Sequence, residues 1–259
     1  MKPKVVILCG GLGTRLKEET EYRPKPMVPI GNKPILWHIM KIYSHYGFKE
    51  FILCLGYKGE VIKDYFSRYE VLNNNFTLTL GQHNELEFHG NHSEIGWKIT
   101  FVDTGLNAHK GARLKRIERF IDSDSFMVTY GDGVANIDIN DLVEFHESHD
   151  KIATVTGVRP PSRFGELIVK GSTIEAFSEK PQVTTGFING GFFVFKRGFF
   201  DFLKDKDECD LEFGPFELLA NQNELVMYEH TGFWHCMDNV RDMEHLNKLW
   251  ISGQAPWMQ

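Results

Sequence analysis

A glycine-rich turn followed by basic side chains is the part of the chain best suited to chemistry. The turn reads Gly10-Gly11-Leu12-Gly13-Thr14-Arg15-Leu16, and Lys25 follows it between Pro24 and Pro26. Glycine lets a backbone approach a ligand closely, and consecutive N–H groups in such a turn bind phosphate oxygens. Arginine offers a planar fork of donors and lysine a compact charge, and both suit a polyphosphate. The turn therefore predicts a site for a ligand with several negative charges.

The turn differs from two well-known phosphate motifs. The Walker A string G-x-x-x-x-G-K-[ST] does not occur in the sequence. A dinucleotide-binding fingerprint needs a third glycine three residues after the second, and Leu16 stands there instead. The glycines alone fit a tight turn with solvated basic residues equally well. The addition of Thr14, Arg15 and Lys25 favours a phosphate site.

Two aspartates stand out as further candidate residues. Asp132 lies between Gly131 and Gly133, directly after an apolar segment, and Asp238 ends the string Trp-His-Cys-Met-Asp. An aspartate between glycines is usually a turn former. A position after an apolar strand nevertheless places Asp132 at the carboxyl edge of an α/β sheet, where ligands bind. The separation of the two aspartates in the sequence does not by itself pair them.

The elements that must position these residues alternate between strand and helix. Residues 5–9 and 51–55 are apolar throughout, which is typical of strands covered on both faces in a parallel sheet. Apolar side chains recur at helical spacing in residues 35–46, and Gly47 stands where a helix C-cap belongs. The alternation favours a doubly wound α/β sheet, mostly parallel and Rossmann-like, with right-handed crossovers. Further strands are predicted at residues 99–102, 126–129 and 153–158, and further helices at 61–69, 112–121 and 139–149.

The pattern changes in two regions. Residues 73–96 are polar and predict a weak strand with an exposed excursion. From Gly165 onward, short alternating strands at residues 166–169, 173–178 and 190–195 predict antiparallel additions over the sheet. No internal repeat, linker or low-complexity tract interrupts the sequence, so one domain covering residues 1–259 is expected.

Composition excludes several classes of protein. The 259 residues include 29 Lys and Arg against 35 Asp and Glu, and the resulting charge of −6 argues against a non-specific binder of nucleic acid or anionic membranes. The cysteines (Cys9, Cys54, Cys209 and Cys236) are far apart in the sequence. We therefore expect no disulfide scaffold, and we expect a cytoplasmic location. No apolar run is long enough for a membrane span or a signal peptide.

Two other kinds of site have little support. The histidines His83, His89, His92, His146 and His149 lack the H-E-x-x-H or Cys/His spacing of a zinc site. No serine lies in a G-x-S-x-G string, so the nucleophile elbow of an α/β-hydrolase is missing.

A series of short strings runs along nearly the whole chain. The strings are Gly10-Gly11-Leu12-Gly13-Thr14-Arg15-Leu16, Pro24-Lys25-Pro26-Met27, Gly56-Tyr57-Lys58-Gly59, Tyr130-Gly131-Asp132-Gly133, Glu179-Lys180-Pro181, Asn189-Gly190-Gly191 and Met237-Asp238. Taken in order, they resemble the signature of the sugar-1-phosphate nucleotidyltransferase family, which implies a nucleotidyltransferase-type fold and a role in nucleotide-sugar biosynthesis. Within the family, the Gly-Tyr-Lys-Gly, Tyr-Gly-Asp-Gly and Phe-Trp-x-x-Met-Asp strings are most similar to those of the enzymes that form CDP-glucose and pyrophosphate from CTP and glucose 1-phosphate.

The resemblance also implies roles for individual residues. Arg15, Lys25 and Asp132 would be catalytic, and Asp132 and Asp238 would hold Mg²⁺, which suits one or two carboxylates together with phosphate oxygens. The nucleotide-binding set would be Leu8, Cys9, Gly10, Gly11, Leu12, Gly13, Thr14, Arg15, Lys25, Thr104, Arg113, Gly131 and Asp132. The sugar-phosphate set would be Tyr130, Gly165, Glu179, Lys180, Asn189 and Gly190. The nucleotide part would cover about residues 1–135 and the sugar part about 136–259, in a homo-oligomer.

The sequence departs from the family pattern in one place that bears on the nucleotide. The family's Thr-Gly-Gly-Arg appears here as Lys110-Gly111-Ala112-Arg113, with a hydroxyl lost and a methyl gained. UTP or dTTP in place of CTP is an alternative, since related enzymes share the front of the motif set. A non-catalytic sugar-nucleotide sensor is another. A nicotinamide oxidoreductase would also explain the glycine turn, but Leu55-Gly56-Tyr57 stands where its acidic residue belongs.

Overall fold

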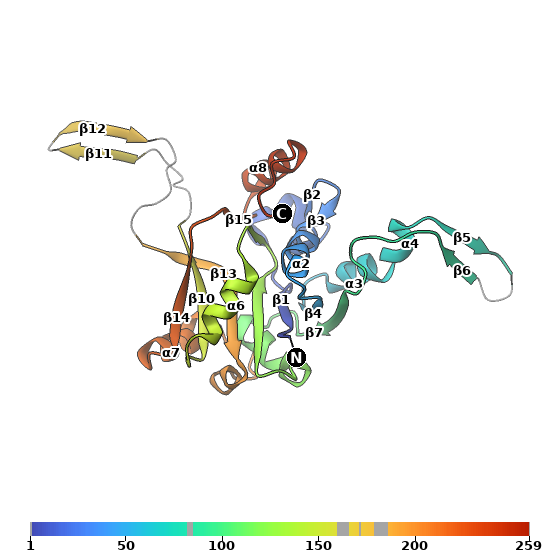
Figure 1. Ribbon diagram of the computed structural model, residues 1–259, viewed down its shortest axis with the longest axis horizontal. Helices are drawn as coiled ribbons and strands as arrows, with labels where there is room; N and C mark the ends of the chain where they lie inside the picture. The colour runs from blue at the N-terminus through green and yellow to red at the C-terminus, as the bar shows by residue number, and fades with distance from the viewer. Residues whose placement is uncertain (1, 82–84, 160–165, 171, 179–185, 259) are drawn as a thin grey trace.

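A central sheet organises the computed structural model, which describes residues 2–81, 85–159, 166–170, 172–178 and 186–258. The sheet has seven strands, and helices pack on both of its faces (Figure 1). In spatial order the strands are β14 (Leu225–His230), β10 (Ala153–Val158), β13 (Ile188–Lys196), β8 (Ser125–Tyr130), β1 (Val5–Leu8), β4 (Glu50–Leu55) and β7 (Lys98–Asp103).

Burial on both faces explains the apolar strands. Val5 and Ile7 belong to one hydrophobic cluster and Val6 and Leu8 to another, because successive side chains of a strand point to opposite faces. β1 pairs in parallel with β4 and β8, β4 with β7, and β10 with β14, whereas β13 runs antiparallel to both of its neighbours. The mostly parallel α/β sheet predicted from the sequence is confirmed.

The helices divide between the two clusters, so each face of the sheet is covered. One face packs against α2 (Ile35–His45), α3 (Gly59–Ser67), α6 (Ile139–Glu147) and α8 (Val240–Ile251). The other packs against α5 (Lys110–Ile117) and α7 (Glu217–Asn221). Shorter elements are α1 (Lys17–Thr20), α4 (Tyr69–Asn73), the 3₁₀ turns η1 (Thr14–Leu16), η2 (Lys25–Met27), η3 (Glu118–Phe120) and η4 (Arg197–Phe202), and the π-helical turn η5 (Glu212–Phe216).

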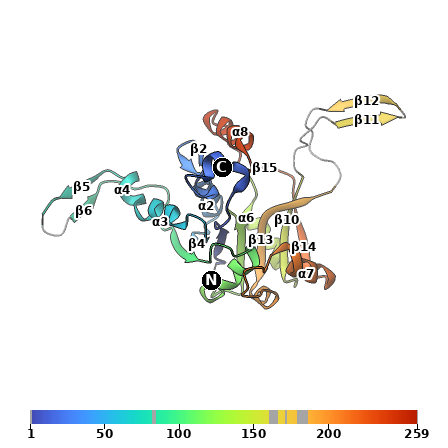
Figure 2. The same cartoon turned by 180° about the vertical axis from the view of Figure 1, so that it is seen from behind.

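Within the described ranges, four strand pairs lie outside the central sheet. They are β2 (Pro29–Ile30) with β3 (Lys33–Pro34), β5 (Phe76–Thr79) with β6 (Glu85–Phe88), β9 (Gly133–Ala135) with β15 (Trp234–Cys236), and β11 (Glu166–Lys170) with β12 (Thr173–Ser178). The β5–β6 and β11–β12 hairpins extend from opposite sides of the body in both views (Figures 1 and 2). The β9–β15 pair, in contrast, connects residues 132 and 237, next to the candidate site described below.

One predicted position in the fold is wrong. The strand expected at residues 190–195 as an addition over the sheet is β13, which lies inside the sheet between β10 and β8. The physical reason is its composition: Phe192 and Val194 enter one hydrophobic cluster while Phe193 and Phe195 enter the other. A strand with large apolar side chains on both faces is stabilised in the centre of a sheet rather than on its surface.

Element boundaries differ slightly from the sequence predictions. The helix expected at residues 61–69 divides at Arg68 into α3 and α4, and the excursion at 73–96 contains the β5–β6 hairpin. The helix expected at 112–121 starts earlier, at Lys110, and ends in the 3₁₀ turn η3.

Candidate active site at the carboxyl edge of the sheet

The carboxyl ends of β1 and β8 open into a cleft of about 490 Å³. Neighbouring parallel strands end at the same edge of a sheet, and α/β proteins bind ligands there. The volume falls within the range of about 300–1,000 Å³ that is usual for small-molecule sites. The cleft is lined by Leu8, Cys9, Gly10, Gly11, Gly13, Thr14, Arg15, Lys25, Pro26, Ala108, His109, Lys110, Arg113, Tyr130, Gly131, Asp132 and Asp210.

Most of the predicted nucleotide-binding residues therefore lie on one cleft. Leu12 and Thr104 are the predicted residues that do not line the cleft: Leu12 is 53% exposed and Thr104 is fully buried. Asp238 is not part of the lining but contacts it through Lys25 and Arg15. The interpretation of the first turn as a wall of a binding site is consistent with this placement.

The glycine turn is shaped by close packing. Gly13 has φ of +63°, and a Cβ there would lie 2.7 Å from Cγ2 of Thr20. A Cβ at Gly10 would lie 2.1 Å from Nη1 of Arg113. Only glycine combines the left-handed backbone at residue 13 with so little space. The turn leads directly into η1, which begins at Thr14.

Lys25 is the centre of an ion cluster. Its Nζ lies 2.6 Å from Oδ2 of Asp132 and 2.7 Å from Oδ1 of Asp238. Nη1 of Arg15 lies 2.7 Å from the other oxygen, Oδ2, of Asp238. Lys25 is buried, whereas the Arg15 side chain is 70% exposed. Two cations near the N-terminus and two carboxylates from distant parts of the chain thus form one charge-balanced group, which we call the Lys25 cluster.

The pairing of β9 with β15 explains why the two aspartates meet. Gly133, which follows Asp132, lies opposite Cys236 in this antiparallel pair. The pairing continues one step further, because Met237 N–H donates to the carbonyl of Asp132 at 2.8 Å. Asp132 and Asp238 therefore emerge side by side from the same end of a short ladder.

The start of α8 fixes Asp238. Its N–H donates to Oδ2 of Asp242 at 2.9 Å, and the same oxygen accepts the N–H of Asn239. The Asn239 side chain in turn accepts the N–H of Asp242, which completes a capping box. This reciprocal arrangement satisfies N–H groups that a helix start leaves unpaired. The cap therefore fixes the backbone that carries the Asp238 carboxylate as well as the start of the helix.

The charges of the cluster stabilise one another. Burial lowers the pKa of Lys25, but the charges of Asp132 and Asp238 and the hydrogen bonds to them outweigh burial, so its pKa is raised. Burial raises the pKa of Asp238, but Lys25 and Arg15 outweigh this and lower it. Both groups are ionised at neutral pH. Cys236 nearby is different: burial, then the charge of Asp238, raises its pKa to about 12, so its thiol is protonated.

The carboxylate pair fits a hard divalent cation. Both aspartates already direct an oxygen at one positive charge, the Lys25 ammonium. Mg²⁺ is typically held by one or two carboxylates and completes its octahedron with phosphate and water oxygens. Within the described residues no group of three or more His, Cys, Asp or Glu side chains could hold a metal. The donor set thus suits a cation that arrives with phosphate ligands.

The Arg113 guanidinium is hydrogen-bonded to other groups of the protein. It donates to the carbonyls of Gly10, Leu55, Gly105 and Leu106 and to the Thr104 hydroxyl. The Thr104 hydroxyl donates to Leu55 O at 2.7 Å. These bonds join the loops after β1, β4 and β7, so Arg113, with the buried Thr104 behind it, holds this edge of the cleft together.

The predicted sugar side is described in part. The Tyr130 hydroxyl accepts a hydrogen bond from Nδ2 of Asn189 at 3.0 Å and donates to Oε1 of Glu212. Gly191, at φ of +79°, allows β13 to approach the Tyr130 ring, because a Cβ there would lie 2.7 Å from Cδ2. Gly190 O accepts the indole N–H of Trp234. Gly165, Glu179 and Lys180 lie outside the described residues.

Several lining residues have no counterpart among the predictions: Pro26, Ala108, His109, Lys110 and Asp210. Asp210 lies in a highly charged stretch, residues 204–210, that resembles an ordinary solvated loop in sequence. The sequence feature that points to this part of the lining is the departure from the family pattern at residues 110–113. In the structure the extra methyl of Ala112 is fully buried and lies outside the lining, while Lys110 faces Glu212.

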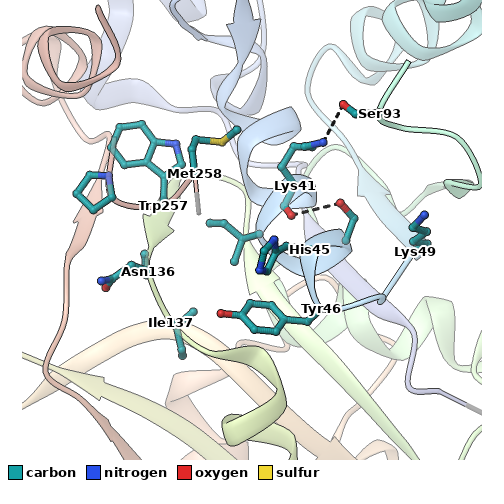
Figure 3. A pocket seen from close by; sticks show the side chains of 13 residues that line it. Lys41, His45, Tyr46, Lys49, Ser93, Asn136, Ile137, Trp257 and Met258 are labelled. Carbon is teal, nitrogen blue, oxygen red and sulfur yellow. Dashed lines mark hydrogen bonds between the residues drawn. The ribbon is translucent and has the colours of Figure 1, made fainter. Parts of the chain in front are cut away.

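A second cavity, of about 190 Å³, lies beside α2 (Figure 3). Residues of α2, the loop after β9 and the last residues of the chain line it, including Lys41, His45 and Trp257. Lys41 donates to Ser93 at 2.9 Å and lies 3.4 Å from the buried carboxylate of Glu94. The cavity has neither a glycine turn nor a carboxylate in its lining. The cleft at the sheet edge is therefore the candidate active site.

The helices of the described residues include none with the length and apolar character required to cross a membrane.

Comparison with known proteins identifies the family to which the chain is similar. The family model described as nucleotidyl transferase matches residues 4–248. The chain is 49% identical over 255 residues to a glucose-1-phosphate cytidylyltransferase of Salmonella typhimurium (strain LT2), an alignment that covers 98% of each chain. It is 28% identical over 258 residues to a mannose-1-phosphate guanyltransferase of Pichia angusta, covering 96% of this chain and 65% of that one.

A solved structure shares the fold. The crystal structure of HddC from Yersinia pseudotuberculosis matches with a TM-score of 0.69 and 24% identity, covering 96% of this chain and all of that one. At this level of identity the match concerns the architecture alone, and it agrees with the mostly parallel sheet described above.

Proposed function

The chain belongs to the nucleotidyl transferase family, and we propose that it transfers the cytidylyl group of CTP to glucose 1-phosphate, giving CDP-glucose and pyrophosphate. The 49% identity to the Salmonella cytidylyltransferase over nearly the full length of both chains supports the choice of substrates. The observation that carries the proposal is the Lys25 cluster, which brings two cations and two carboxylates to the end of a glycine turn.

The reaction is a direct displacement at phosphorus. A phosphate oxygen of glucose 1-phosphate attacks the α-phosphorus of CTP, and the bond from that phosphorus to the oxygen bridging to the β-phosphate breaks. Pyrophosphate leaves with the electron pair of the broken bond. The attacking phosphate is already ionised, so neither a protein nucleophile nor a general base is required. The work left to the protein is to hold two anions in line against their repulsion.

The residues of the cleft supply that positioning. The backbone of the Gly10–Gly13 turn and the side chains of Arg15 and Lys25 would bind the triphosphate, because N–H groups and fixed cations stabilise charge that develops on phosphate oxygens. Tyr130 and Asn189, hydrogen-bonded to each other, would border the sugar. Gly165, Glu179, Lys180 and Gly190 complete the proposed sugar-phosphate site.

Asp132 and Asp238 would hold Mg²⁺. When bound, this ion would neutralise phosphate charge and polarise the α-phosphate. The carboxylates that now share the Lys25 ammonium would then be shared with the ion, which leaves Lys25 free to contact phosphate oxygens.

The division of labour along the chain follows from these assignments. The nucleotide part would cover about residues 1–135 and the sugar part about 136–259, joined by the β9–β15 pair. A homo-oligomer is also part of the proposal, and its support is the exposed apolar side chains of the β5–β6 hairpin: Leu78, Leu80, Leu86 and Phe88. The four unpaired cysteines support a cytoplasmic location.

The test is pyrophosphate release from Mg²⁺, glucose 1-phosphate and each nucleoside triphosphate in turn, using the wild type and Asp132→Asn. We expect release with CTP in the wild type and a turnover lower by about 10²-fold or more in Asp132→Asn, the scale of losing one preorganised electrostatic group. Asp122→Asn, which removes a surface carboxylate paired with Lys4, is the matched control and should keep wild-type turnover. The proposal would be refuted if none of the nucleoside triphosphates gave pyrophosphate release, or if Asp132→Asn turned over as fast as the wild type.

A further inference from the structure

The segment 204–212 lies across the N-terminal end of α5. His109 N–H donates to the carbonyl of Asp207 at 2.8 Å, and Ala112 N–H donates to that of Cys209 at 2.9 Å. The first N–H groups of a helix have no partners within it, so these carbonyls complete α5. Gly111 permits the contact, because a Cβ there would lie 2.4 Å from the carbonyl oxygen of Asp210. The backbone that carries Asp210 is therefore fixed against the helix.

This contact brings the Asp210 carboxylate to the cleft. Its Oδ1 accepts the N–H groups of Leu211 at 2.7 Å and Glu212 at 3.0 Å. Its Oδ2 accepts only Nδ1–H of His109, at 3.2 Å, among the described residues. A carboxylate oxygen can accept two hydrogen bonds, so Oδ2 keeps one acceptor position. The Asp210 side chain is 19% exposed, and Asp210 lies between this cleft and a neighbouring cavity of about 260 Å³, lining both.

Asp210 is ionised at neutral pH. Burial raises its pKa, but hydrogen bonds with Glu212 and Leu211 and the charge of Lys110 outweigh burial and lower it. The adjacent start of α5 adds a partial positive charge that favours a carboxylate. The group therefore offers acceptors and no donor.

The wall around Asp210 is where a nucleobase would lie. In the described part of the chain, Ala108, His109 and Asp210 make no hydrogen bond or ion pair with the Lys25 cluster, which would take the phosphates. A nucleotide with its phosphates at that cluster would extend its base toward the remaining wall, which includes Ala108, His109 and Asp210. Two of the other polar side chains there are engaged: Arg113 donates to backbone carbonyls and Lys110 pairs with Glu212.

We propose that Asp210 accepts a hydrogen bond from the 4-amino group of cytosine and so makes the cleft select CTP over UTP and dTTP. This inference rests on the proposed cytidylyl transfer. Cytosine presents an amino donor at ring position 4, whereas uracil and thymine present a carbonyl acceptor there. A carboxylate binds the first and repels the second. Sites built around a hydrogen bond discriminate strongly, since the wrong partner leaves a buried polar group unpaired.

The test compares kcat/KM for CTP and UTP in the wild type, Asp210→Asn and Asp205→Asn. Asparagine has nearly the same shape but adds an NH₂ donor that uracil O4 can accept. We expect Asp210→Asn to lower the CTP/UTP ratio by about 10-fold or more, mainly by loss with CTP. Asp205, on the same segment, pairs with Arg116 and is not part of the lining, so Asp205→Asn should keep the wild-type ratio. A pyrimidin-2-one nucleoside triphosphate, which lacks the 4-amino group, should be discriminated against by the wild type and much less by Asp210→Asn.

Each failure has its own meaning. Absence of turnover with CTP in the wild type refutes the proposed function. If the wild type turns over CTP but Asp210→Asn loses kcat/KM equally with CTP and UTP, the base assignment is overturned. A change in Asp210→Asn that is confined to the KM for glucose 1-phosphate overturns it as well. If Asp210→Asn does not fold, Asp210→Ser keeps an acceptor for the two backbone N–H groups while removing the carboxylate. An unchanged CTP/UTP ratio in Asp210→Ser also overturns the assignment.

Discussion

Replacing Lys25 by methionine tests the Lys25 cluster most directly. Methionine has a similar length but no charge, so Asp132 and Asp238 would face each other without the ammonium between them. Each carboxylate now lies within 2.7 Å of the same nitrogen. Two like charges about 5 Å apart, at an effective dielectric constant of about 20, repel by about 3 kcal/mol. Part of this would be relieved by small movements and by water, so we expect the free energy of unfolding to fall by about 2 kcal/mol.

The same substitution should change the response to metal. In the wild type Lys25 competes with a cation for both carboxylates, whereas in Lys25→Met the pair is free. Mg²⁺ at about ten times its dissociation constant would stabilise the variant by about 1.4 kcal/mol through binding to the folded state alone. Without nucleotide, we expect Mg²⁺ to raise the Tm of Lys25→Met clearly and that of the wild type little. Turnover with CTP should fall by about 10²-fold or more, because the triphosphate loses a preorganised cation.

Lys41→Met is the matched control for burial of an ion pair. Lys41 lies 3.4 Å from the buried Glu94 carboxylate and outside the cleft, so its loss should lower stability with little effect on turnover. The measurements are thermal and denaturant unfolding with and without Mg²⁺, and pyrophosphate release. Turnover of Lys25→Met within about threefold of the wild type would remove Lys25 from the mechanism. An equal Mg²⁺ effect on both Tm values would show that the ammonium does not occupy the metal's place.

Two further predictions concern packing and pH. Gly131→Ala places a Cβ 2.8 Å from the carbonyl oxygen of Leu8 and should cost about 1–3 kcal/mol of stability in denaturant unfolding, whereas Gly11→Ala, with nothing within 4 Å, should cost little; equal losses would contradict this. Burial lowers the pKa of His38 to about 4, and its Nδ1 accepts the Trp257 indole N–H, so the folded protein keeps it neutral. The unfolded chain takes up that proton near the ordinary value of 6.5, so stability should fall as pH drops from 6.5 to 4. His38→Gln should show a shallower slope over this window, and an unchanged slope would count against the assignment.

The sequence predicted the parts of the site that depend on neighbouring residues. An apolar strand followed by glycines places the Gly10–Gly13 turn at a sheet edge, because strand and turn signals are both local. The structure puts this turn and Lys25 in one cleft. The apolar strands and the first helix were predictable for the same reason. A run of apolar residues indicates a strand buried on both faces, and apolar residues at helical spacing indicate a helix with one buried face.

The parts that depend on distant pairing were not predictable. β9 and β15 are three residues each, and such short segments do not specify their own register. Their pairing alone brings Asp132 and Asp238 together. The same limit applies to Asp210, whose position depends on carbonyls of its segment completing α5. β13 is a different case, because its continuous apolar run at residues 192–195 is itself the local pattern of a strand buried on both faces. The prediction of an addition over the sheet did not follow that pattern.

The charge balance of the Lys25 cluster links the stability of the fold to the chemistry proposed for it. A buried ammonium without partners would be costly, and so would two adjacent carboxylates. Together they hold each other ionised: the pKa of Lys25 is raised and that of Asp238 is lowered. A cleft that held only cations would bind polyphosphates but would repel a divalent ion, and one that held only carboxylates would do the reverse. In the Lys25 cluster the cations and carboxylates lie in contact. When a metal and its nucleotide bind together, the carboxylates can pair with the metal and the cations with the phosphates. Before that, no unpaired charge has to be buried.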